Sequence, residues 1–337
     1  SVAVAYNLTV PNPAAYGHLR VEPGDAPTLT SASAVNFMAR QTIANGLTTK
    51  ISPTRTIKLY NGATGPADAI VDIVGYFVPA ASATPGQVAG GRFTPTTPTR
   101  VYSSTPGGAA PTGVDQTTTV DLSAVLPTGA SAVAYNITVV APTAPGHLRV
   151  YPAGQARPAT STINFITGDR VANGTAVQVS PDRKINVYNG STAPVSFIID
   201  VVGYYSATGA FFHAIDPVRT MSTRPNDNGP GPIDPDSQRT VDIWHTQATP
   251  QTEVVPVGAT AIDYNVTVVA AGTMGHLRVW PADQTKPGAS TLNWPAPGYT
   301  RANGTTVGIS PTRHVNIYNS AGTPTNVLID INGYYIP

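Results

Sequence analysis

The side chains of this sequence best suited to binding or catalysis are histidines and arginines that recur in one setting. The segment Gly-His-Leu-Arg-Val begins at Gly17, Gly146 and Gly275, so it holds three of the six histidines. Side chains of an extended strand alternate between two faces, which places the Leu and Val on one face and the His and Arg on the other. The polar face comprises His18, Arg20 and Glu22 in the first copy, His147, Arg149 and Tyr151 in the second, and His276, Arg278 and Trp280 in the third.

This repeated strip allows a binding and a structural interpretation. It could bind a glycan or a partner chain, because aromatic faces stack on sugar rings and guanidinium groups bind acidic groups. It could equally be a strand face on which each arginine packs against its cross-strand neighbours, and we favour this second interpretation. A zinc site is less favoured still, since one histidine per copy supplies no ligand set unless three copies converge.

A second recurring group is an aspartate within an apolar segment, at Asp72, Asp200 and Asp330. An ionised carboxylate in such a strand is costly unless it is hydrogen-bonded or paired. We therefore expect a structural buried aspartate that accepts loop N–H groups or pairs with an arginine such as Arg183. A catalytic acid is disfavoured, because paired acid–base chemistry needs a second carboxylate and none recurs at a fixed offset.

Asparagines also recur at one position, where Asn7, Asn136 and Asn265 each open an Asn-x-Thr sequence. This pattern marks glycosylation acceptors, but here it falls inside an expected strand. We therefore expect inward amides that bond to a neighbouring loop.

The remaining motifs do not indicate an enzyme. The sequence contains no Gly-x-Ser-x-Gly, His-Glu-x-x-His, P-loop or dinucleotide fingerprint, and no nucleophile and base recur together. One polar loop has carboxylates but not the spacing of a calcium loop, so we interpret it as an ordinary loop; it contains Asn226, Asp227, Asn228, Asp234 and Asp236. We expect no catalytic residue, no metal site and no cofactor.

The elements that position these residues belong to a long tandem repeat. Tyr-Asn pairs begin at Tyr6, Tyr135 and Tyr264, at two intervals of 129 residues. Each copy ends with Asp-Ile/Val-x-Gly-Tyr, followed by an aromatic residue. A period this long exceeds that of solenoid repeats, so each copy is interpreted as a domain.

Composition indicates an all-β protein. Charged residues make up 11% of the 337 residues, with 31 Gly and 33 Pro, a balance that favours strands and turns over surface helices. The net charge of +1 provides no field to attract nucleic acid or an anionic membrane. Cysteine is absent, so no disulfide is available. No apolar run approaches the roughly 18 residues of a membrane span.

Local patterns predict how the strands are arranged. Residues 2–10 alternate apolar and small or polar side chains, which is typical of a half-buried strand. The turn formers of residues 52–55 separate two extended segments, 47–51 and 56–60, and predict a hairpin. With the returning segment 69–77, each copy is expected to end in a three-stranded meander.

The first copy starts late. Copies two and three carry an upstream segment, such as Phe-x-Pro-x-x-Pro-x-Arg-Val from Phe93 to Val101. When the copies are aligned, about 38 residues of copy two, 92–129, have no counterpart in copy one. We expect three tandem β-sandwich-like modules, the first lacking its N-terminal strands. The boundaries are 1–79 for the truncated first module, 80–91 for a linker, 92–205 for the second module, 206–210 for a linker, and 211–337 for the third module.

These motifs resemble a tandem β-module of secreted actinobacterial cell-surface proteins, often found beside cell-wall hydrolases. The resemblance covers essentially the whole chain, through Phe93 to Val101, Asn136 to Val139, Gly146 to Pro152, Asn164-Phe165, Ala172-Asn173, Val187 to Asn189 and Asp200 to Tyr204. Family members often carry Asp-Thr-Arg after the first element, whereas this chain has Ser103-Ser104-Thr105 and Ser222-Thr223-Arg224. The resemblance implies an extracellular β-module and no enzymatic activity.

Together these observations favour an extracellular structural repeat protein of a bacterial surface, self-associating into a fibre or surface layer. Its partners would be copies of itself through strand or module contacts, because an incomplete β-module leaves unpaired backbone groups. The alternative is an array of adhesive modules that bind cell-wall glycan, in which weak sites gain strength through avidity. No nucleic acid partner and no membrane span are expected.

Overall fold

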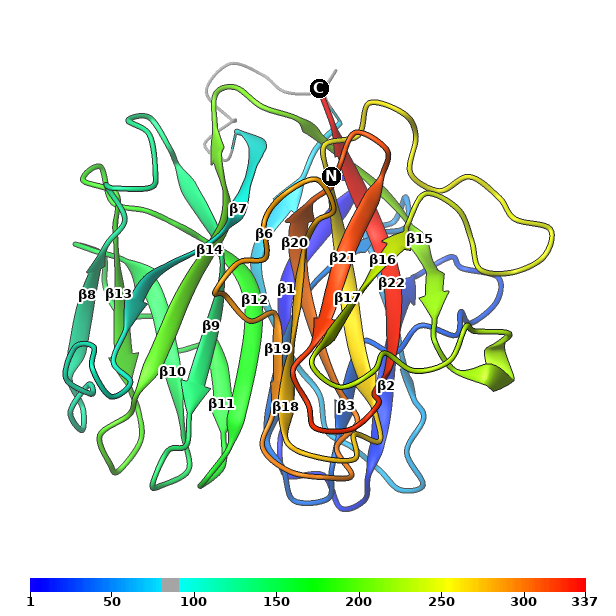
Figure 1. Cartoon of the computed structure of the whole chain (residues 1–337). Coiled ribbons are helices and arrows are strands. Elements are labelled where there is room, and N and C mark those ends of the chain that lie inside the picture. The colour runs from blue at the N-terminus through cyan, green and yellow to red at the C-terminus, as the bar shows by residue number, and fades with distance from the viewer. Residues whose placement is uncertain (80–90) are drawn as a thin grey trace.

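The computed structural model describes residues 1–79 and 91–337, and it is all-β (Figure 1). Most of the predicted linker 80–91 lies outside the described residues. Within them the strands form six antiparallel sheets, two for each copy of the repeat. The two sheets of a copy pack face to face around an apolar core, so the predicted β-sandwich fold class is confirmed.

The first module has two three-stranded sheets. Their strands are, in sheet order, β4 (Ile43–Lys50), β1 (Ala3–Val10) and β6 (Ile70–Phe77), and then β3 (Val35–Phe37), β2 (Gly17–Pro23) and β5 (Ile57–Asn61).

The second and third modules have a fourth strand in each sheet. Module two orders them β12 (Arg170–Gln178), β9 (Ala132–Val140), β14 (Phe197–Ser206), β7 (Arg92–Ser103), and β11 (Ile163–Phe165), β10 (Gly146–Pro152), β13 (Lys184–Asn189), β8 (Thr117–Asp121). Module three orders them β20 (Arg301–Gly308), β17 (Ala261–Val269), β22 (Asn326–Ile336), β15 (Phe211–Ser222), and β19 (Leu292–Trp294), β18 (Gly275–Pro281), β21 (His314–Asn319), β16 (Ser237–Asp242). A short 3-10 turn, η2 (Pro225–Asp227), follows β15.

The predicted hairpin at residues 52–55 is wrong. The turn itself forms, with the Ser52 N–H donating to the Thr56 carbonyl and the Arg55 N–H to the Ser52 carbonyl. The strands on either side do not pair, because β4 bonds to β1 while β5 bonds to β2 in the opposite sheet. The β5–β6 connection also changes sheets, so the expected meander is absent too. The turn thus passes from one sheet to the other, and Leu47 of β4 and Ile57 of β5 both pack on the core between the two sheets.

The half-buried strand expected at residues 2–10 is buried on both faces. Tyr6, Leu8 and Val10 fill the core of the first module. Asn7 and Thr9, on the other face, are also buried. The second face is covered because the modules pack against one another, as the hydrogen bond from Asn7 to the second module shows.

The three modules close around a pseudo-threefold axis. The strands β4, β12 and β20, which carry Ala-Asn-Gly, contact one another pairwise. At the axis the N–H of Gly46 donates to Asn173 Oδ1 at 2.6 Å. The equivalent bonds run from Gly174 to Asn303 at 2.8 Å and from Gly304 to Asn45 at 2.7 Å. Each module therefore bonds to the next, and the third returns to the first.

A side chain larger than hydrogen has no room at this axis. A Cβ on Gly46 would overlap the Gly174 carbonyl, one on Gly174 the Gly304 carbonyl, and one on Gly304 the Gly46 carbonyl. Glycine therefore permits the three backbones to approach closely. The Asn-Gly pairs of β4, β12 and β20 are the contact that closes the array.

Candidate functional site

The recurring aspartates form ion pairs in modules two and three. Arg100, on β7, places Nε 2.9 Å from Asp200 Oδ1 on β14, and Arg219, on β15, makes the same contact with Asp330 on β22. Both carboxylates are almost completely buried. Burial raises the pKa of each carboxyl, and the adjacent guanidinium opposes that rise only in part. The arginine that fulfils the expected role is thus on the adjacent strand, and it is not Arg183, which bonds to the carbonyls of Ser123 and Leu126.

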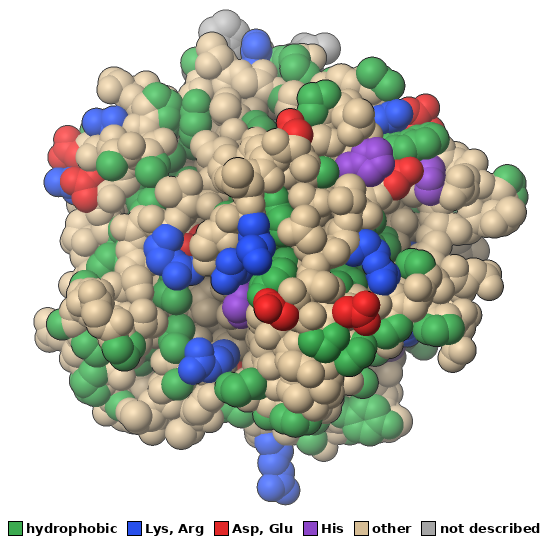
Figure 2. Space-filling view, in the orientation of Figure 1, with side chains coloured by type: hydrophobic (Ala, Val, Ile, Leu, Met, Phe, Trp, Pro, Cys, Tyr) green, Lys and Arg blue, Asp and Glu red, His purple; other side chains and the backbone are tan. Residues whose placement is uncertain are grey.

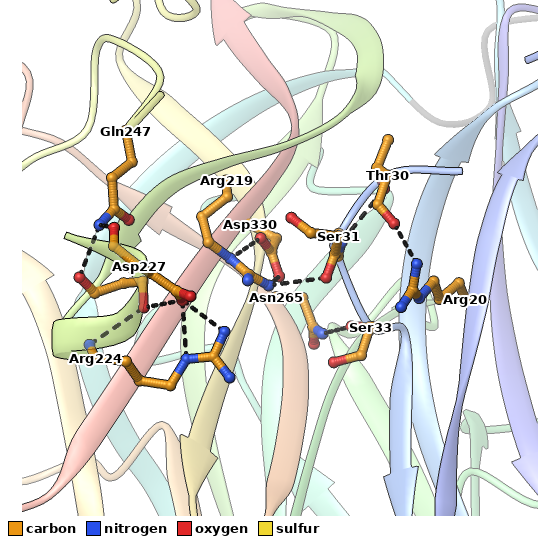
Figure 3. A network of polar contacts seen from close by, with 12 residues as sticks. Arg20, Thr30, Ser31, Ser33, Arg219, Arg224, Asp227, Gln247, Asn265 and Asp330 are labelled. Atoms are coloured by element: carbon orange, nitrogen blue, oxygen red, sulfur yellow. Dashed lines mark hydrogen bonds and ion pairs between the residues drawn. The ribbon is translucent and has the colours of Figure 1, made fainter. Parts of the chain in front are cut away.

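Each of these arginines also connects its module to the next. Arg219 lies between Asp330 and Ser31, donating Nη2 to the Ser31 carbonyl at 3.1 Å (Figure 3). Arg100 Nη2 lies 3.5 Å from the equivalent carbonyl, that of Gly288 in the third module. For an arginine at the corresponding edge of module one, the aligned carbonyl is that of Ala159, in the second module.

The equivalent aspartate of the first module is not buried, which corrects the expectation for Asp72. No basic side chain among residues 1–79 and 91–337 makes an ion pair with it. Its carboxyl lies on β6, where modules two and three have a further strand bonded alongside. Partial burial raises the pKa of Asp72 above its usual value. The carboxylate is therefore an acceptor whose counterpart arginine is missing.

A vacant aromatic position lies close to this aspartate on the same strand. In module two, a Cβ on Gly203 would overlap the ring of Phe93, and in module three Gly333 is covered in the same way by Phe212. The equivalent Gly75 has no non-adjacent atom within 4 Å of its Cβ position. The glycine of the closing Asp-x-x-Gly-Tyr motif thus leaves room for the ring of a phenylalanine on the neighbouring strand, and we call this position the seat. In module one no ring lies over the glycine, so the seat is open.

The interior of the first module is exposed along the same side. Ile73 is 70% exposed, whereas its counterparts Val201 and Ile331 are 1% and 0% exposed. On the other sheet Leu59 is 41% exposed and its counterparts Val187 and Ile317 are 0% exposed. The exposed apolar set comprises Leu59, Tyr60, Ile70, Val71, Ile73, Val74 and Tyr76. We call this set of exposed residues on β5 and β6 the open edge.

The His-Arg strip forms three similar local clusters. Arg20, Arg149 and Arg278 each donate Nε to the histidine two residues earlier, at 3.1–3.2 Å. Each guanidinium also stacks on a cross-strand tyrosine at 5.4–5.5 Å. Each donates Nη1 to a loop carbonyl, namely that of Thr30, Pro158 or Pro287. The arginines are thus held by their own modules.

The histidines of the strip act as acceptors, so their rings are neutral. Burial, with the adjacent arginine second, lowers the pKa of His18 and His147, and it lowers the pKa of His276 to about 4. The side chain of Trp280 is buried and bonds to the Gln284 carbonyl, and Tyr151 and Glu22 are buried as well. The following loops fold over the last residue of each strip, and each arginine packs on a cross-strand tyrosine, as the favoured structural interpretation predicts. Figure 2 shows Lys and Arg side chains lying singly or in small groups on one face of the molecule.

The sequon asparagines lie between modules. Asn7 donates Nδ2 to the Ser161 carbonyl at 2.9 Å, Asn136 to that of Ser290, and Asn265 to that of Ser33. Their Oδ1 atoms accept from the asparagines at the axis. The acceptor loop belongs to the next module in each case, an arrangement that a single copy of the repeat does not reveal.

The polar loop of the third module is held by its own contacts. Asp227 accepts from Ser222 and Arg224, and these bonds lower the pKa of its carboxyl. Asp236 accepts from the Tyr318 hydroxyl. Within the described ranges, no group of three or more His, Cys, Asp or Glu side chains is placed to hold a metal ion. No helix among the same residues has the length and hydropathy to span a membrane.

Sequence reasoning missed the role of Phe93, Phe212 and the glycines beneath them. A usable signal was present, because Phe-x-x-x-x-Pro-x-Arg occurs upstream of copies two and three, at Phe93 to Arg100 and at Phe212 to Arg219. Phe and Arg are seven residues apart in this motif, whereas the glycine and the aspartate they contact are three residues apart, and register shifts in the strand pairing accommodate the difference. The pairing itself is between residues about 110 positions apart, which no local pattern reports.

Comparisons with known proteins show only distant similarity. No family model and no curated protein matches the chain. A chain from Sulfolobus Turreted Icosahedral Virus aligns over 73% of this chain and 92% of its own, with 9% identity and a TM-score of 0.20. The tandem CBM22 domains of Paenibacillus barcinonensis Xyn10C align over 72% and 93%, with 9% identity and a TM-score of 0.21. Similarity at this level carries no argument about function. The sheets themselves define the class of the protein, which is an array of β-sandwich modules.

Proposed function

We propose that this protein is a non-enzymatic structural protein of a bacterial surface, located outside the cell, which associates with other chains of its own repeat. The observation that carries the proposal is the open edge, where β5 and β6 each end a sheet and expose apolar side chains that the other modules bury. An unpaired strand edge offers a row of N–H and C=O groups to another strand. Strand addition at this edge would join one chain to the next.

A structural role also accounts for the recurring ionisable groups. Asp200 and Asp330 are paired with arginines, and His147 and His276 accept hydrogen bonds from arginines of their own modules. These contacts leave the groups engaged in the fold rather than directed at a substrate. The same engagement of Arg20, Arg149 and Arg278 is the reason that we rank the cell-wall glycan alternative second.

The test is the state of association of the purified protein. We expect the wild-type chain to form larger species as its concentration rises, measured by sedimentation velocity and negative-stain electron microscopy. Ile73→Lys should shift the association to at least about tenfold higher concentration, because a charge on an exposed strand edge blocks pairing. Since Ile73 is already largely exposed, the variant should remain folded.

The matched control is Val257→Lys, which places the same charge at an equally exposed apolar position of the third module. This control should associate like the wild type. Monodisperse monomers at high concentration in the wild type would contradict the proposal, and so would equal effects of Ile73→Lys and Val257→Lys.

A further inference from the structure

We infer that the open edge is a receptor for one kind of polypeptide strand, an extended segment carrying a further copy of Phe-x-x-x-x-Pro-x-Arg. The inference rests on the proposed function and specifies the partner of that site. The filled edges of modules two and three show what the edge of module one accepts.

The first requirement is a phenylalanine over Gly75. Phe93 contacts Tyr205 of its own module and Tyr335 of the next, at ring-centroid distances of 5.2 and 4.5 Å. Phe212 contacts Tyr335 at 5.0 Å and Phe77, of the first module, at 4.3 Å. By the same rotation, a phenylalanine over Gly75 would meet Phe77 and Tyr205. The vacant seat therefore already has both aromatic walls.

The second requirement is an arginine seven residues later. In the filled modules that arginine pairs with Asp200 or Asp330 and reaches a carbonyl of the next module. Asp72 and the Ala159 carbonyl occupy the equivalent positions. A planar guanidinium suits this site because it binds a carboxylate through two N–H groups and still has a donor for the carbonyl. Lysine cannot make the same set of bonds.

The third requirement is an antiparallel strand along β6. The strands β7 and β15 bond to β14 and β22 with irregular register near the proline, between Val201 and Gly203 in module two and between Ala214 and Val218 in module three. Proline is tolerated at such an edge because it lacks only an N–H that faces outward. The proline of the motif thus fits an edge strand that terminates the sheet.

The two copies of the motif within residues 1–337 are already engaged. Residues 1–337 contain the motif twice, and both copies already occupy their own modules as β7 and β15. The occupant of the open edge is therefore a further copy of the same motif, in addition to β7 and β15.

The test is binding of a labelled peptide with the sequence of Arg92–Ser103 to the 337-residue protein, followed by fluorescence anisotropy. We expect saturable one-to-one binding. Replacing the phenylalanine or the arginine of the peptide by alanine should weaken it by about tenfold or more, because a buried ring or a charge-assisted pair is lost. Asp72→Asn and Gly75→Leu in the protein should weaken it similarly, whereas Asp68→Asn, at an exposed position just before β6, should not.

Absent binding would overturn the inference, and so would equal binding of the alanine peptides or indifference to Asp72→Asn. Different results would contradict this inference and the proposed function. If chains associate through Ile73 but ignore the peptide, the open edges pair with each other and only this inference fails. If the peptide binds but chains never associate, the receptor stands and the structural role falls.

Discussion

Arg219 and Asp330 form an ion pair at 2.9 Å in which the carboxylate is fully buried and the guanidinium also reaches the Ser31 carbonyl of the first module. One side chain thus neutralises a buried charge, fastens an edge strand and joins two modules. Arg100 and Asp200 repeat the relationship between modules two and three. The first module lacks it, which makes Asp72 the natural comparison for the other two aspartates.

The buried aspartates should differ from Asp72 in their effect on stability. Asp200→Ala leaves Arg100 without its partner and should lower the free energy of unfolding by about 2–4 kcal/mol, less than the roughly 3–5 kcal/mol of a fully buried pair because the Arg100 side chain is 39% exposed. Asp72→Ala should change it by less than about 0.5 kcal/mol, because no pair is lost. Thermal and urea unfolding measure both. An unchanged melting temperature for Asp200→Ala would refute the structural role of the pair.

Replacing the glycine of the closing motif by alanine should also destabilise the second module more than the first. Gly203→Ala forces the added methyl group into the Phe93 ring and should cost about 1–3 kcal/mol, as overpacking does. Gly75→Ala meets open space and should be close to neutral. Equal destabilisation by the two changes would mean that the seat over Gly75 is not vacant in solution.

The ring of asparagines at the axis should be a major source of stability between modules. Asn173→Ala removes the acceptor for the Gly46 N–H and the donor to Asn7, and leaves both partners buried. We expect a loss of about 2–4 kcal/mol, because each unsatisfied buried polar group costs roughly 1–3 kcal/mol. Asn226→Ala, on an exposed loop, is the control. Calorimetry that shows the same melting temperature for both variants would contradict the closed arrangement.

Stability should fall as pH rises towards neutrality, because of Asp263. This carboxyl accepts from Thr48 of the first module and from Asn332, yet burial raises its pKa from 3.8 to about 7. The folded state therefore holds a proton that the unfolded state releases near pH 4, so the free energy of unfolding declines from about pH 4 to pH 7.

The size of this decline should be on the order of 2–4 kcal/mol, because a pKa that differs by one between the folded and unfolded states corresponds to about 1.4 kcal/mol. Asp263→Asn cannot ionise and should flatten the profile relative to the wild type, while Asp283→Asn, at an exposed site, should not. Urea unfolding at several pH values measures the difference. A profile of Asp263→Asn parallel to that of the wild type would exclude Asp263 as its cause.

The tandem repeat, the strand content and the late start of the first copy follow from residue spacing, because duplicated sequence and two-residue alternation are local properties. Local signals could not tell that residues 52–55 connect two different sheets, since the same turn closes a hairpin or crosses a sandwich. Nor could they place Asn45, Asn173 and Asn303 at a shared axis. Those contacts join residues more than 120 positions apart, and only packing of three whole modules creates them.

Hydrogen exchange at β6 tests the central claim, that the first module presents an edge which another strand covers. We predict that amides of Ile70–Phe77 exchange much faster in dilute protein than those of Phe197–Ser206 and Asn326–Ile336, and become protected when the chains associate. Mass spectrometry of the dilute and associated protein compares these segments directly. Protection of β6 equal to that of β14 in dilute protein, or no gain of protection on association, would contradict the account.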